Sequence, residues 1–261
     1  MKSRFFFACL GCLLVFATPA HAISNGSFDG NGHPYVGAVV YKFGTDKFVG
    51  CSGTLISSTV FLTAGHCLAF LPSAGLTAAD LSVSFSSDTF AALNDIQAVS
   101  YSVMPGFGRD LGDLRDLGVI ILPAGSTSGI TPAILPTAGL LDQMAAKGGL
   151  VGQSFDNVGY GVNPSWKQGP PRFLFDGRRY FSTSPFQGLT QTWLKLLMNN
   201  DATGQGGVCY GDSGSGHFLP GTRRIVATTT GGDAVCRAEN YNYRLDTPGA
   251  RQFLGNFVTL P

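Results

Sequence analysis

Residues 209–216 read Cys-Tyr-Gly-Asp-Ser-Gly-Ser-Gly and place Ser213 in a glycine-rich turn directly after an aspartate. Far upstream, residues 63–67 read Thr-Ala-Gly-His-Cys and place His66 beside a cysteine. A serine hydroxyl is a weak nucleophile until a neighbouring imidazole accepts its proton, and the backbone N–H groups of a tight turn, such as the one at Gly211, can stabilise an oxyanion. Together the two segments indicate acyl transfer.

A candidate third member lies between them, because residues 115–122 read Arg-Asp-Leu-Gly-Val-Ile-Ile-Leu. Asp116 opens an apolar, strand-like run that would bury its carboxylate against the histidine, whereas the alternatives Asp110 and Asp113 lie in a polar loop. The chain order His, Asp, Ser is one of three in which the same triad geometry occurs. Each motif is weak alone, since Gly-Asp-Ser-Gly is an ordinary turn and a lone histidine is usually structural.

With the three motifs in this order, residues 23–257 resemble the trypsin/chymotrypsin-like serine peptidases. The resemblance implies an all-β fold of two antiparallel six-stranded barrels with a short C-terminal helix and the active site between the barrels. It implies that Ser213 is the nucleophile, that His66 is the general base and then the acid, and that Asp116 holds the imidazole tautomer. The N–H groups of Gly211 and Ser213 would form the oxyanion hole.

Two segments depart from the family pattern. After the nucleophile the chain has Gly214-Ser215-Gly216 where the family usually has Gly-Gly-Pro, so the turn loses a proline and gains a hydroxyl. Before the aspartate it has Met104-Pro105 where many relatives have His-Pro. Neither change touches a proton-transfer group.

The composition suits a globular β protein. Apolar residues make up 44% of the 261 residues, charged residues only 13%, and there are 36 glycines, which fits short strands and tight turns better than long charged helices. The formal net charge of +1 gives no electrostatic case for nucleic acid or a membrane surface. The family resemblance implies a protein or peptide substrate, and we expect a monomer with no cofactor and no metal. Strand-like runs in the two halves are 36–43, 48–56, 60–63, 81–85, 96–103 and 117–122, then 150–160, 172–175, 179–182, 193–198, 224–230 and 241–245.

Residues 1–22 match a secretory signal peptide. Lys2 and Arg4 precede the apolar run 5–16, and Ala20-His21-Ala22 offers small residues for cleavage. Twelve apolar residues are too few to span a bilayer, so we expect an exported protein, extracellular or periplasmic, with no membrane attachment after cleavage. We expect a first barrel over 23–130, with His66 and Asp116, and a second over 131–261, with Ser213.

Removal of the signal takes Cys9 and Cys12 with it and leaves four cysteines in an oxidising compartment, where they allow three pairings. No remaining cysteine belongs to a Cys-x-x-Cys pair, which disfavours a metal site. The family resemblance selects one pairing, Cys51 with Cys67 and Cys209 with Cys236.

A Pro/Gly/Ser/Thr-rich stretch at 123–136 is the expected crossing between the barrels. The clearest helix begins near Pro248, where Asp246 or Thr247 can cap it, and we expect it to pack on the second barrel. The remaining histidines and tryptophans receive structural interpretations, because none has a partner motif: His33, His217, Trp166 and Trp193.

The family resemblance places the floor of the primary specificity pocket six residues before the nucleophile, at Gly207. No carboxylate there can pair with a buried cation, and Val208 adds an apolar wall, so we expect cleavage after uncharged apolar or aromatic residues. Asp233 is the first suspect if a carboxylate reaches the pocket from elsewhere. The opposite wall is expected from residues 228–232, with Thr229, Thr230 and Gly232 as substrate-binding candidates, and Tyr241 narrows the pocket.

Family members typically become active when a freed Ile or Val inserts and its α-ammonium pairs with the aspartate before the nucleophile, here Asp212. Cleavage after Ala22 would leave Ile23 as the first residue, so that export itself would activate the enzyme. The alternative is cleavage after Ala20, which leaves His21-Ala22 for another peptidase to trim.

The sequence thus favours a secreted serine endopeptidase that works through an acyl-enzyme. A catalytically silent binding protein of the same fold usually lacks the His, Asp or Ser, and all three are present here. Nothing favours a structural protein that keeps only the fold.

Overall fold

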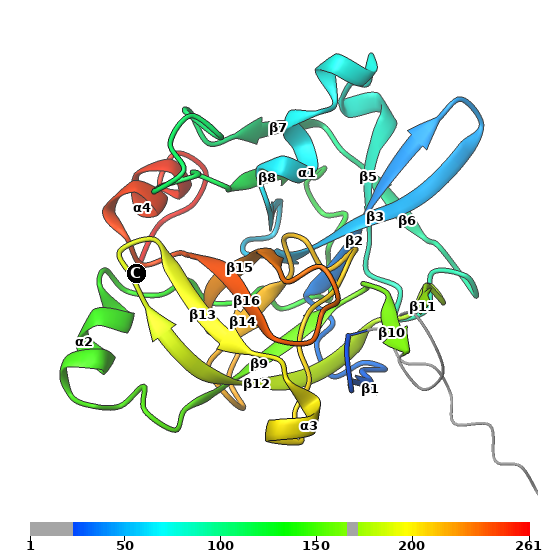
Figure 1. Ribbon diagram of the computed structural model, residues 1–261. Coiled ribbons are helices and arrows are strands. Elements are labelled where there is room, and N and C mark those ends of the chain that lie inside the picture. Colours follow the sequence, from blue (N-terminus) through cyan, green and yellow to red (C-terminus); the bar gives the residue numbers. More distant parts are fainter. Residues whose placement is uncertain (1–22, 166–171) are drawn as a thin grey trace, which may run out of the picture.

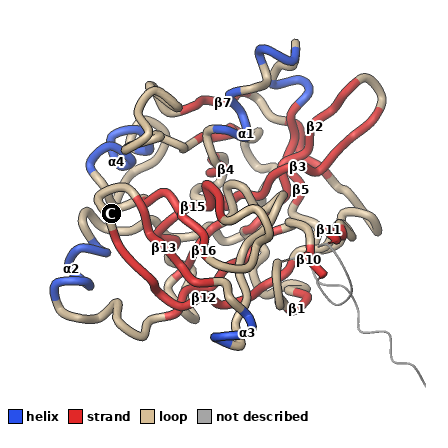
Figure 2. The backbone as a smooth tube through the Cα atoms, in the orientation of Figure 1, coloured by secondary structure: helices blue, strands red, loops and turns tan. Residues whose placement is uncertain are grey.

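The computed structural model describes residues 23–165 and 172–261. The predicted signal peptide and Trp166 lie outside the described residues. Two seven-stranded antiparallel sheets dominate the described part, accompanied by one small two-stranded sheet (Figure 1). Strands occupy the centre, helices α2, α3 and α4 lie at the periphery, and α1 lies beside the central strands (Figure 2). No helix within the described ranges is long and apolar enough to cross a membrane.

The first sheet has the strand order β6-β5-β2-β3-β4-β8-β7. Its edge strands β6 and β7 are consecutive parts of one bent segment, interrupted at Ala98 and Val99. The Ala98 N–H donates to Leu81 O (2.9 Å) and the Val99 N–H to Ile121 O (2.8 Å), so this one segment meets both ends of the curled sheet. The strands are β2 Val36–Phe43, β3 Asp46–Leu55, β4 Val60–Thr63, β5 Leu81–Ser84, β6 Asp95–Gln97, β7 Ser100–Val103 and β8 Gly118–Ile121.

The second sheet has the order β1-β12-β13-β16-β15-β14-β9 and closes into a six-stranded barrel, because β12 also pairs with β9. Closure leaves only β1 outside the ring, and this strand from the start of the chain pairs with the second sheet. The strands are β1 Ser27–Phe28, β9 Ser154–Gly159, β12 Tyr180–Leu189, β13 Trp193–Leu197, β14 Gly216–Phe218, β15 Ile225–Gly232 and β16 Glu239–Arg244. The small third sheet pairs β10 Asn163–Ser165 with β11 Arg172–Leu174.

The helices are short: α1 His66–Ala69, η1 Pro72–Ala74, η2 Ala78–Asp80, α2 Leu140–Ala146, α3 Asn200–Thr203 and α4 Pro248–Leu254. Helix α4 begins as expected, with Pro248 in its first turn and the Thr247 hydroxyl accepting from the Ala250 N–H. Its Phe253 lies near Met104, which follows β7, and belongs to an apolar cluster that also contains Tyr243 of β16 and Leu245 (Figure 1).

That cluster crosses the boundary between the sheets. It contains most of the buried apolar residues of β2, those of β4 and β8, and also Val158 and Phe218 of the second sheet. The two sheets therefore share a core, which fixes their relative position. The all-β prediction of a chymotrypsin-like fold with a short C-terminal helix is confirmed: the second sheet is a closed six-stranded barrel, and the first is a curled half-barrel.

Candidate active site

Strand register brings His66 and Asp116 together. His66 follows β4 and Asp116 precedes β8, and these strands pair antiparallel with Thr63 opposite Gly118. The His66 ring Nδ1 lies 2.9 Å from Asp116 Oδ2, and the His66 backbone N–H donates to Asp116 Oδ1 at 2.8 Å. The approach requires Gly65, since a Cβ there would lie 3.0 Å from Leu117 O and 3.2 Å from Asp116 Oδ1.

The Asp116 carboxyl group is 1% exposed, so its oxygens are directed to the imidazole rather than to water. The two alternative aspartates serve the loop before it. Asp110 accepts from the Gly112 N–H at 2.8 Å, and Asp113 accepts from the Tyr243 hydroxyl at 2.7 Å. Of the three aspartates, Asp116 is the one hydrogen-bonded to His66 within the described residues.

Ser213 approaches the histidine from the second barrel. The Ser52 N–H of β3 donates to Ser213 O (2.9 Å), which pins the turn to the first barrel. Gly214, at φ +79°, fits so closely that a Cβ would lie 2.2 Å from Thr63 Oγ1 and 2.6 Å from Ala64 N. The turn therefore sits against the residues that lead into His66. Within the described ranges, no hydrogen bond joins the Ser213 hydroxyl to His66 Nε2. Catalytic hydrogen bonds of this kind often tighten only when substrate binds.

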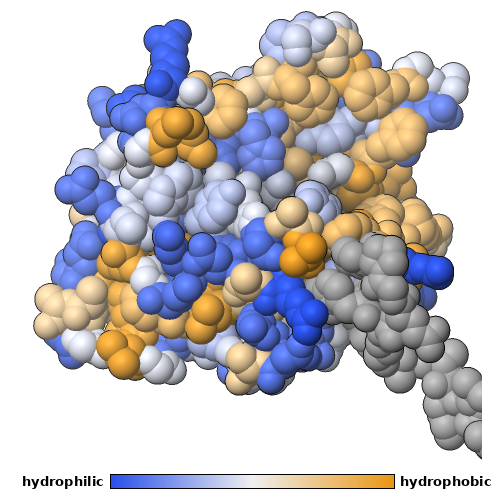
Figure 3. Space-filling view, viewed as in Figure 1, coloured by the Kyte–Doolittle hydropathy of each residue, from blue (hydrophilic) through white to orange (hydrophobic). Residues whose placement is uncertain are grey.

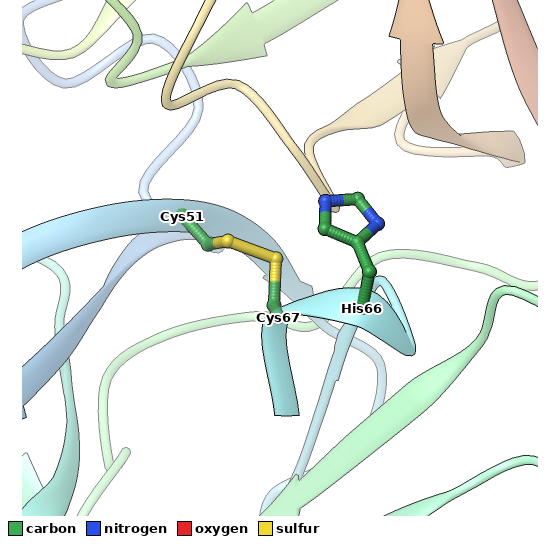
Figure 4. A group of neighbouring side chains, drawn as sticks. All are labelled: Cys51, His66 and Cys67. Carbon is green, nitrogen blue, oxygen red and sulfur yellow. A yellow bond between two sulfur atoms is a disulfide. The ribbon is translucent and has the colours of Figure 1, made fainter. Parts of the chain in front are cut away.

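The disulfide Cys51–Cys67 lies beside the His66 ring (Figure 4). The ligand atoms of these three residues lie within 4.8 Å of one another, but sulfurs joined to each other are not the thiolates that bind metals. The second disulfide joins Cys209 to Cys236 and ties the start of the nucleophile turn to the far wall of the pocket. Both pairings are those that the resemblance implies.

Two N–H groups of the turn are left for an oxyanion. Gly211 has φ +93°, a conformation that glycine adopts without strain, and its carbonyl accepts from the Ser52 hydroxyl at 3.0 Å. The neighbouring Asp212 N–H donates to Cys209 O (3.0 Å). In the described part of the chain the N–H groups of Gly211 and Ser213 donate no hydrogen bond. These are the two N–H groups expected to form the oxyanion hole.

Asp212 is fully buried, and its carboxylate accepts from two backbone N–H groups, those of Gly161 (2.8 Å) and Cys209 (2.9 Å). Both Gly159 and Gly161 make room for it, since a Cβ on either would lie 2.2 or 2.3 Å from a carboxylate oxygen. Burial raises the pKa of Asp212 to about 7, against the effect of these two hydrogen bonds. No cation pairs with this carboxylate among the described residues.

The start of the described chain pairs with the segment just before this turn. Ile23 is buried and packs against Tyr180. Ser24 exchanges two backbone hydrogen bonds with Gly207, at 2.9 and 3.1 Å. Gly207 lies five residues before Asp212, so the segment that follows Ile23 is already paired with the wall beside the nucleophile turn.

A cavity of about 180 Å³ opens beside Ser213. Its lining includes the predicted residues Val208, Thr229, Thr230, Gly232 and Tyr241. The predicted floor residue Gly207 is absent from the lining, because Met198, at the end of β13, lies over it: a Cβ on Gly207 would be 2.2 Å from Met198 Cβ. The sequence analysis missed Met198, which has no motif around it.

Asp233 also lines the cavity, but its carboxylate is occupied by its own loop. It accepts from the backbone N–H groups of Arg237 (3.1 Å), Ala238 (2.7 Å) and Glu239 (3.2 Å). These hydrogen bonds fix the carboxylate to the backbone of the loop formed by residues 233–239. The cavity therefore offers an entering side chain mainly apolar walls and two threonines.

Behind the cavity, His217 is fully buried in a chain of neutral hydrogen bonds whose direction can be deduced. The Ser184 hydroxyl donates to Gly206 O (2.7 Å), so it accepts from Asn157 Nδ2 (2.7 Å). Asn157 Oδ1 must then face His217 Nδ1 (2.7 Å), which donates to it. Burial lowers the pKa of His217 to about 3, so the ring is neutral and its Nε2 is an acceptor.

The same chain continues to the nucleophile turn. The Thr229 hydroxyl donates to His217 Nε2 (2.8 Å), which leaves the Ser215 hydroxyl to donate to Thr229 Oγ1 (2.8 Å). The Thr229 carbonyl in turn accepts from the Gly214 N–H (2.8 Å). The hydroxyl that this chain has in place of the family's glycine thus has a defined partner, and the structural interpretation of His217 agrees with its position.

The geometry describes a two-barrel fold of the chymotrypsin type with a Ser, a His and an Asp at the junction of the barrels. The trypsin family model matches residues 23–251, and the chain belongs to that family. Comparison with curated protein sequences gives no match.

Two solved structures share the fold. A collagenase (HL collagenase) superposes with a TM-score of 0.63 at 15% identity, over 90% of this chain and 98% of its own. The protein HBP superposes with a TM-score of 0.68 at 17% identity, over 92% of this chain and 98% of its own. At these identities the likeness concerns the fold alone.

Proposed function

We propose that this protein is an exported serine endopeptidase that cleaves peptide bonds through an acyl-enzyme on Ser213. The observation that carries the proposal is the buried Asp116 carboxylate bonded to His66 Nδ1 at 2.9 Å, with the Ser213 turn pinned against the residues that precede His66. Membership of the trypsin family supports a serine protease.

In this mechanism the Asp116 carboxylate accepts a hydrogen bond from the Nδ1–H of His66, which leaves the lone pair of His66 Nε2 free to take the Ser213 proton. The serine oxygen attacks the substrate carbonyl, and the N–H groups of Gly211 and Ser213 stabilise the oxyanion. The His66 imidazolium then protonates the leaving nitrogen. Water, deprotonated by the same imidazole, releases the acyl group.

The apolar cavity supports cleavage after uncharged apolar or aromatic residues. Met198 and Val208 supply apolar surface, and Asp233 is bound by backbone N–H groups. A Lys or Arg side chain would enter without a free carboxylate to pair with, which disfavours it.

The proposed activation depends on the buried carboxylate of Asp212. Cleavage after Ala22 frees the α-ammonium of Ile23, whose neighbour Ser24 is already paired with Gly207. An ammonium at Asp212 would supply the cation that the buried carboxylate lacks. Export would then both deliver and activate a monomeric enzyme, with residues 1–22 as signal, 23–130 as first barrel and 131–261 as second.

The decisive test compares the mature protein with its Ser213→Ala variant. We expect the variant to lose turnover by about 10⁴-fold or more, because the nucleophile is gone while binding and the oxyanion donors remain. A fluorophosphonate probe should label the parent and not the variant. Equal peptidase activity in the two proteins would exclude the mechanism, whereas a folded parent that neither cleaves nor is labelled would identify a silent binding protein.

A further inference from the structure

Arg179 is a buried arginine that the proposed reaction does not use directly. It comes just before β12 of the second barrel, and its side chain is 1% exposed. Figure 3 shows hydrophilic side chains spread over the outer face of the molecule, which is where charged residues normally lie. A buried guanidinium needs a carboxylate and several further acceptors around it. The positions of these acceptors define what Arg179 holds together.

The carboxylate comes from the N-terminal segment. The Arg179 Nε–H donates to Asp29 Oδ2 at 2.7 Å, and the Asp29 side chain is 2% exposed. Arg179 Nη2 donates to Gly30 O, also at 2.7 Å, and the Asp29 N–H donates back to Arg179 O at 3.0 Å. Burial opposes ionisation of Asp29, but hydrogen bonds from His33 and Arg179 and the charge of Arg179 outweigh it and lower the pKa of Asp29. Arg179 and Asp29 thus form a buried ion pair.

The chain before Asp29 has little other hold. Strand β1 consists only of Ser27 and Phe28, and both side chains are exposed, that of Phe28 by 49%. Asn25 is exposed as well. Apolar burial therefore contributes little here, and backbone hydrogen bonds of an exposed strand open readily. The ion pair is the main fixed point behind the buried Ile23.

The third nitrogen of the guanidinium contacts the other side of the junction. Arg179 Nη1 donates to Val36 O of β2 at 2.9 Å and to the Tyr160 hydroxyl oxygen at 3.2 Å. Tyr160 follows β9 and comes directly before Gly161, whose N–H donates to the buried Asp212 carboxylate at 2.8 Å. One side chain therefore contacts both the N-terminal segment and the loop that supports Asp212.

An anchor at Asp29 matters because the end that it holds is short. Asp29 comes six residues after Ile23, and an extended chain of that length reaches about 20 Å. A tethered group meets its partner at a far higher effective concentration than a freely moving one. Ser24 already pairs with Gly207, at 2.9 and 3.1 Å. Little further freedom is then lost when the Ile23 end pairs with Asp212.

We propose that Arg179 is a positioning residue for activation. Its ion pair with Asp29 docks residues 24–30 on the second barrel before the N-terminus is freed, so that cleavage after Ala22 places the Ile23 ammonium beside Asp212. This inference rests on the proposed function and deepens it. Activation becomes a local change at Ile23, at the end of a segment that is already in place.

The test compares the same substitution at two neighbouring arginines. Arg179→Lys keeps the charge, but a single ammonium cannot replace the planar set of donors that reaches Asp29, Gly30 and Val36. Arg178→Lys is the matched control, because the Arg178 side chain is 47% exposed and pairs with Asp88 at 2.9 Å. Both variants are made in the form that begins at Ile23 and in the form that begins at His21.

In the form that begins at Ile23, the first measurement is the rate at which cyanate modifies the α-amine, followed by mass spectrometry of the N-terminal peptide. We expect Arg179→Lys to be modified about 10-fold faster than the parent or more, because the docked end opens more often. Its kcat should fall by a similar factor while KM stays within a few fold, since fewer molecules are in the active state. Arg178→Lys should match the parent in all three quantities.

In the form that begins at His21, amide hydrogen exchange tests docking without any catalysis. The N–H groups of Ser24 and Gly207, which bond to each other's carbonyls, should be protected in the parent. Arg179→Lys should lose about 10-fold of that protection or more, whereas the amides of β13 and β16 keep theirs, which also shows that the variant is folded.

The outcomes separate the two proposals. With an active parent, a modification rate or Ser24 exchange in Arg179→Lys within about twofold of the parent overturns the role of Arg179 alone. An equal loss in Arg178→Lys, or a loss of protection throughout β13 and β16, also overturns it, because the effect would then not be specific to docking. A parent that neither cleaves peptides nor reacts with a fluorophosphonate probe overturns the proposed function, and the role in activation with it.

Discussion

The histidine side and the serine side of the site are built by different means. On the first barrel, paired strands deliver both partners, and the Asp116 carboxylate accepts two hydrogen bonds from His66. On the second barrel, the nucleophile lies in a turn held by glycines at positive φ, and the buried Asp212 accepts only from backbone N–H groups.

The two sides differ in whether the buried carboxylate has a side-chain partner. Folding alone completes the His66–Asp116 pair, because the imidazole can share or take a proton. The nucleophile turn instead buries a carboxylate that no side-chain cation in the described residues reaches. Control of activity is therefore expected on the second barrel, where a single positive charge remains to be supplied.

The largest effect is expected at the His66–Asp116 pair, which folding alone completes. Asp116→Asn should lower kcat/KM by about 10⁴-fold, because an amide at this position favours the wrong imidazole tautomer. Asp113→Asn is the control, since Asp113 contacts Tyr243 and not His66, and it should stay within a few fold of the parent. Steady-state hydrolysis of a peptide substrate measures both, and a loss below about 10-fold for Asp116→Asn would contradict the assigned role.

The second largest effect is expected at the nucleophile turn, where Asp212 is buried. A protein that begins at Ile23 should be about 10²-fold to 10³-fold more active than one that still carries His21-Ala22, if the freed ammonium orders the oxyanion donors. Its activity should fall above about pH 8, as the α-amino group loses its proton. N-terminal sequencing and pH profiles of both forms test this, and full activity with His21 attached would refute it.

A smaller effect concerns the cavity. Met198→Ala should shift the preference toward larger aromatic residues by about 10-fold, since the space above Gly207 would open. Asp233→Asn should leave the cleavage profile unchanged, because the carboxylate is bound to backbone N–H groups. A peptide-library profile that is dominated by Lys or Arg, and that Asp233→Asn alters, would reverse the interpretation.

The smallest effect lies in the hydrogen-bond chain behind the turn. Ser215→Ala removes a donor and leaves Thr229 with its bond to His217. We expect a loss of about 1 kcal/mol in the free energy of unfolding and activity within about twofold of the parent. Urea unfolding measures the first quantity, and a large loss of activity without a loss of stability would give Ser215 a direct role in the reaction.

The sequence predicts features that depend on short motifs and their order: the family, the two-barrel fold and the disulfide pairing. It does not predict contacts made by side chains that come from distant strands. Met198 reaches the cavity because β13 pairs with β16 and because Gly207 has no side chain to exclude it. Helix α4 was recognised from its capping residues and its apolar face.

The buried His217 and Asp212 also determine how many protons folding takes up or releases. Between about pH 4 and 6.5, an unfolded chain protonates His217 while the folded one does not, so stability should rise by about 1.4 kcal/mol per pH unit. Over the same pH range, an unpaired Asp212 is protonated in the folded chain and ionised in the unfolded one. As the pH rises, Asp212 should therefore lower stability by the same amount per pH unit.

The two slopes cancel while Asp212 has no cation. Once an ammonium holds that carboxylate ionised, only the His217 slope remains, and acid should destabilise the protein. Removal of His21-Ala22 would then convert an acid-tolerant precursor into an acid-sensitive enzyme. Urea midpoints at pH 4.5 and 6.5 should coincide for the form that begins at His21 and separate for the form that begins at Ile23; equal midpoints in both forms would rule out this coupling.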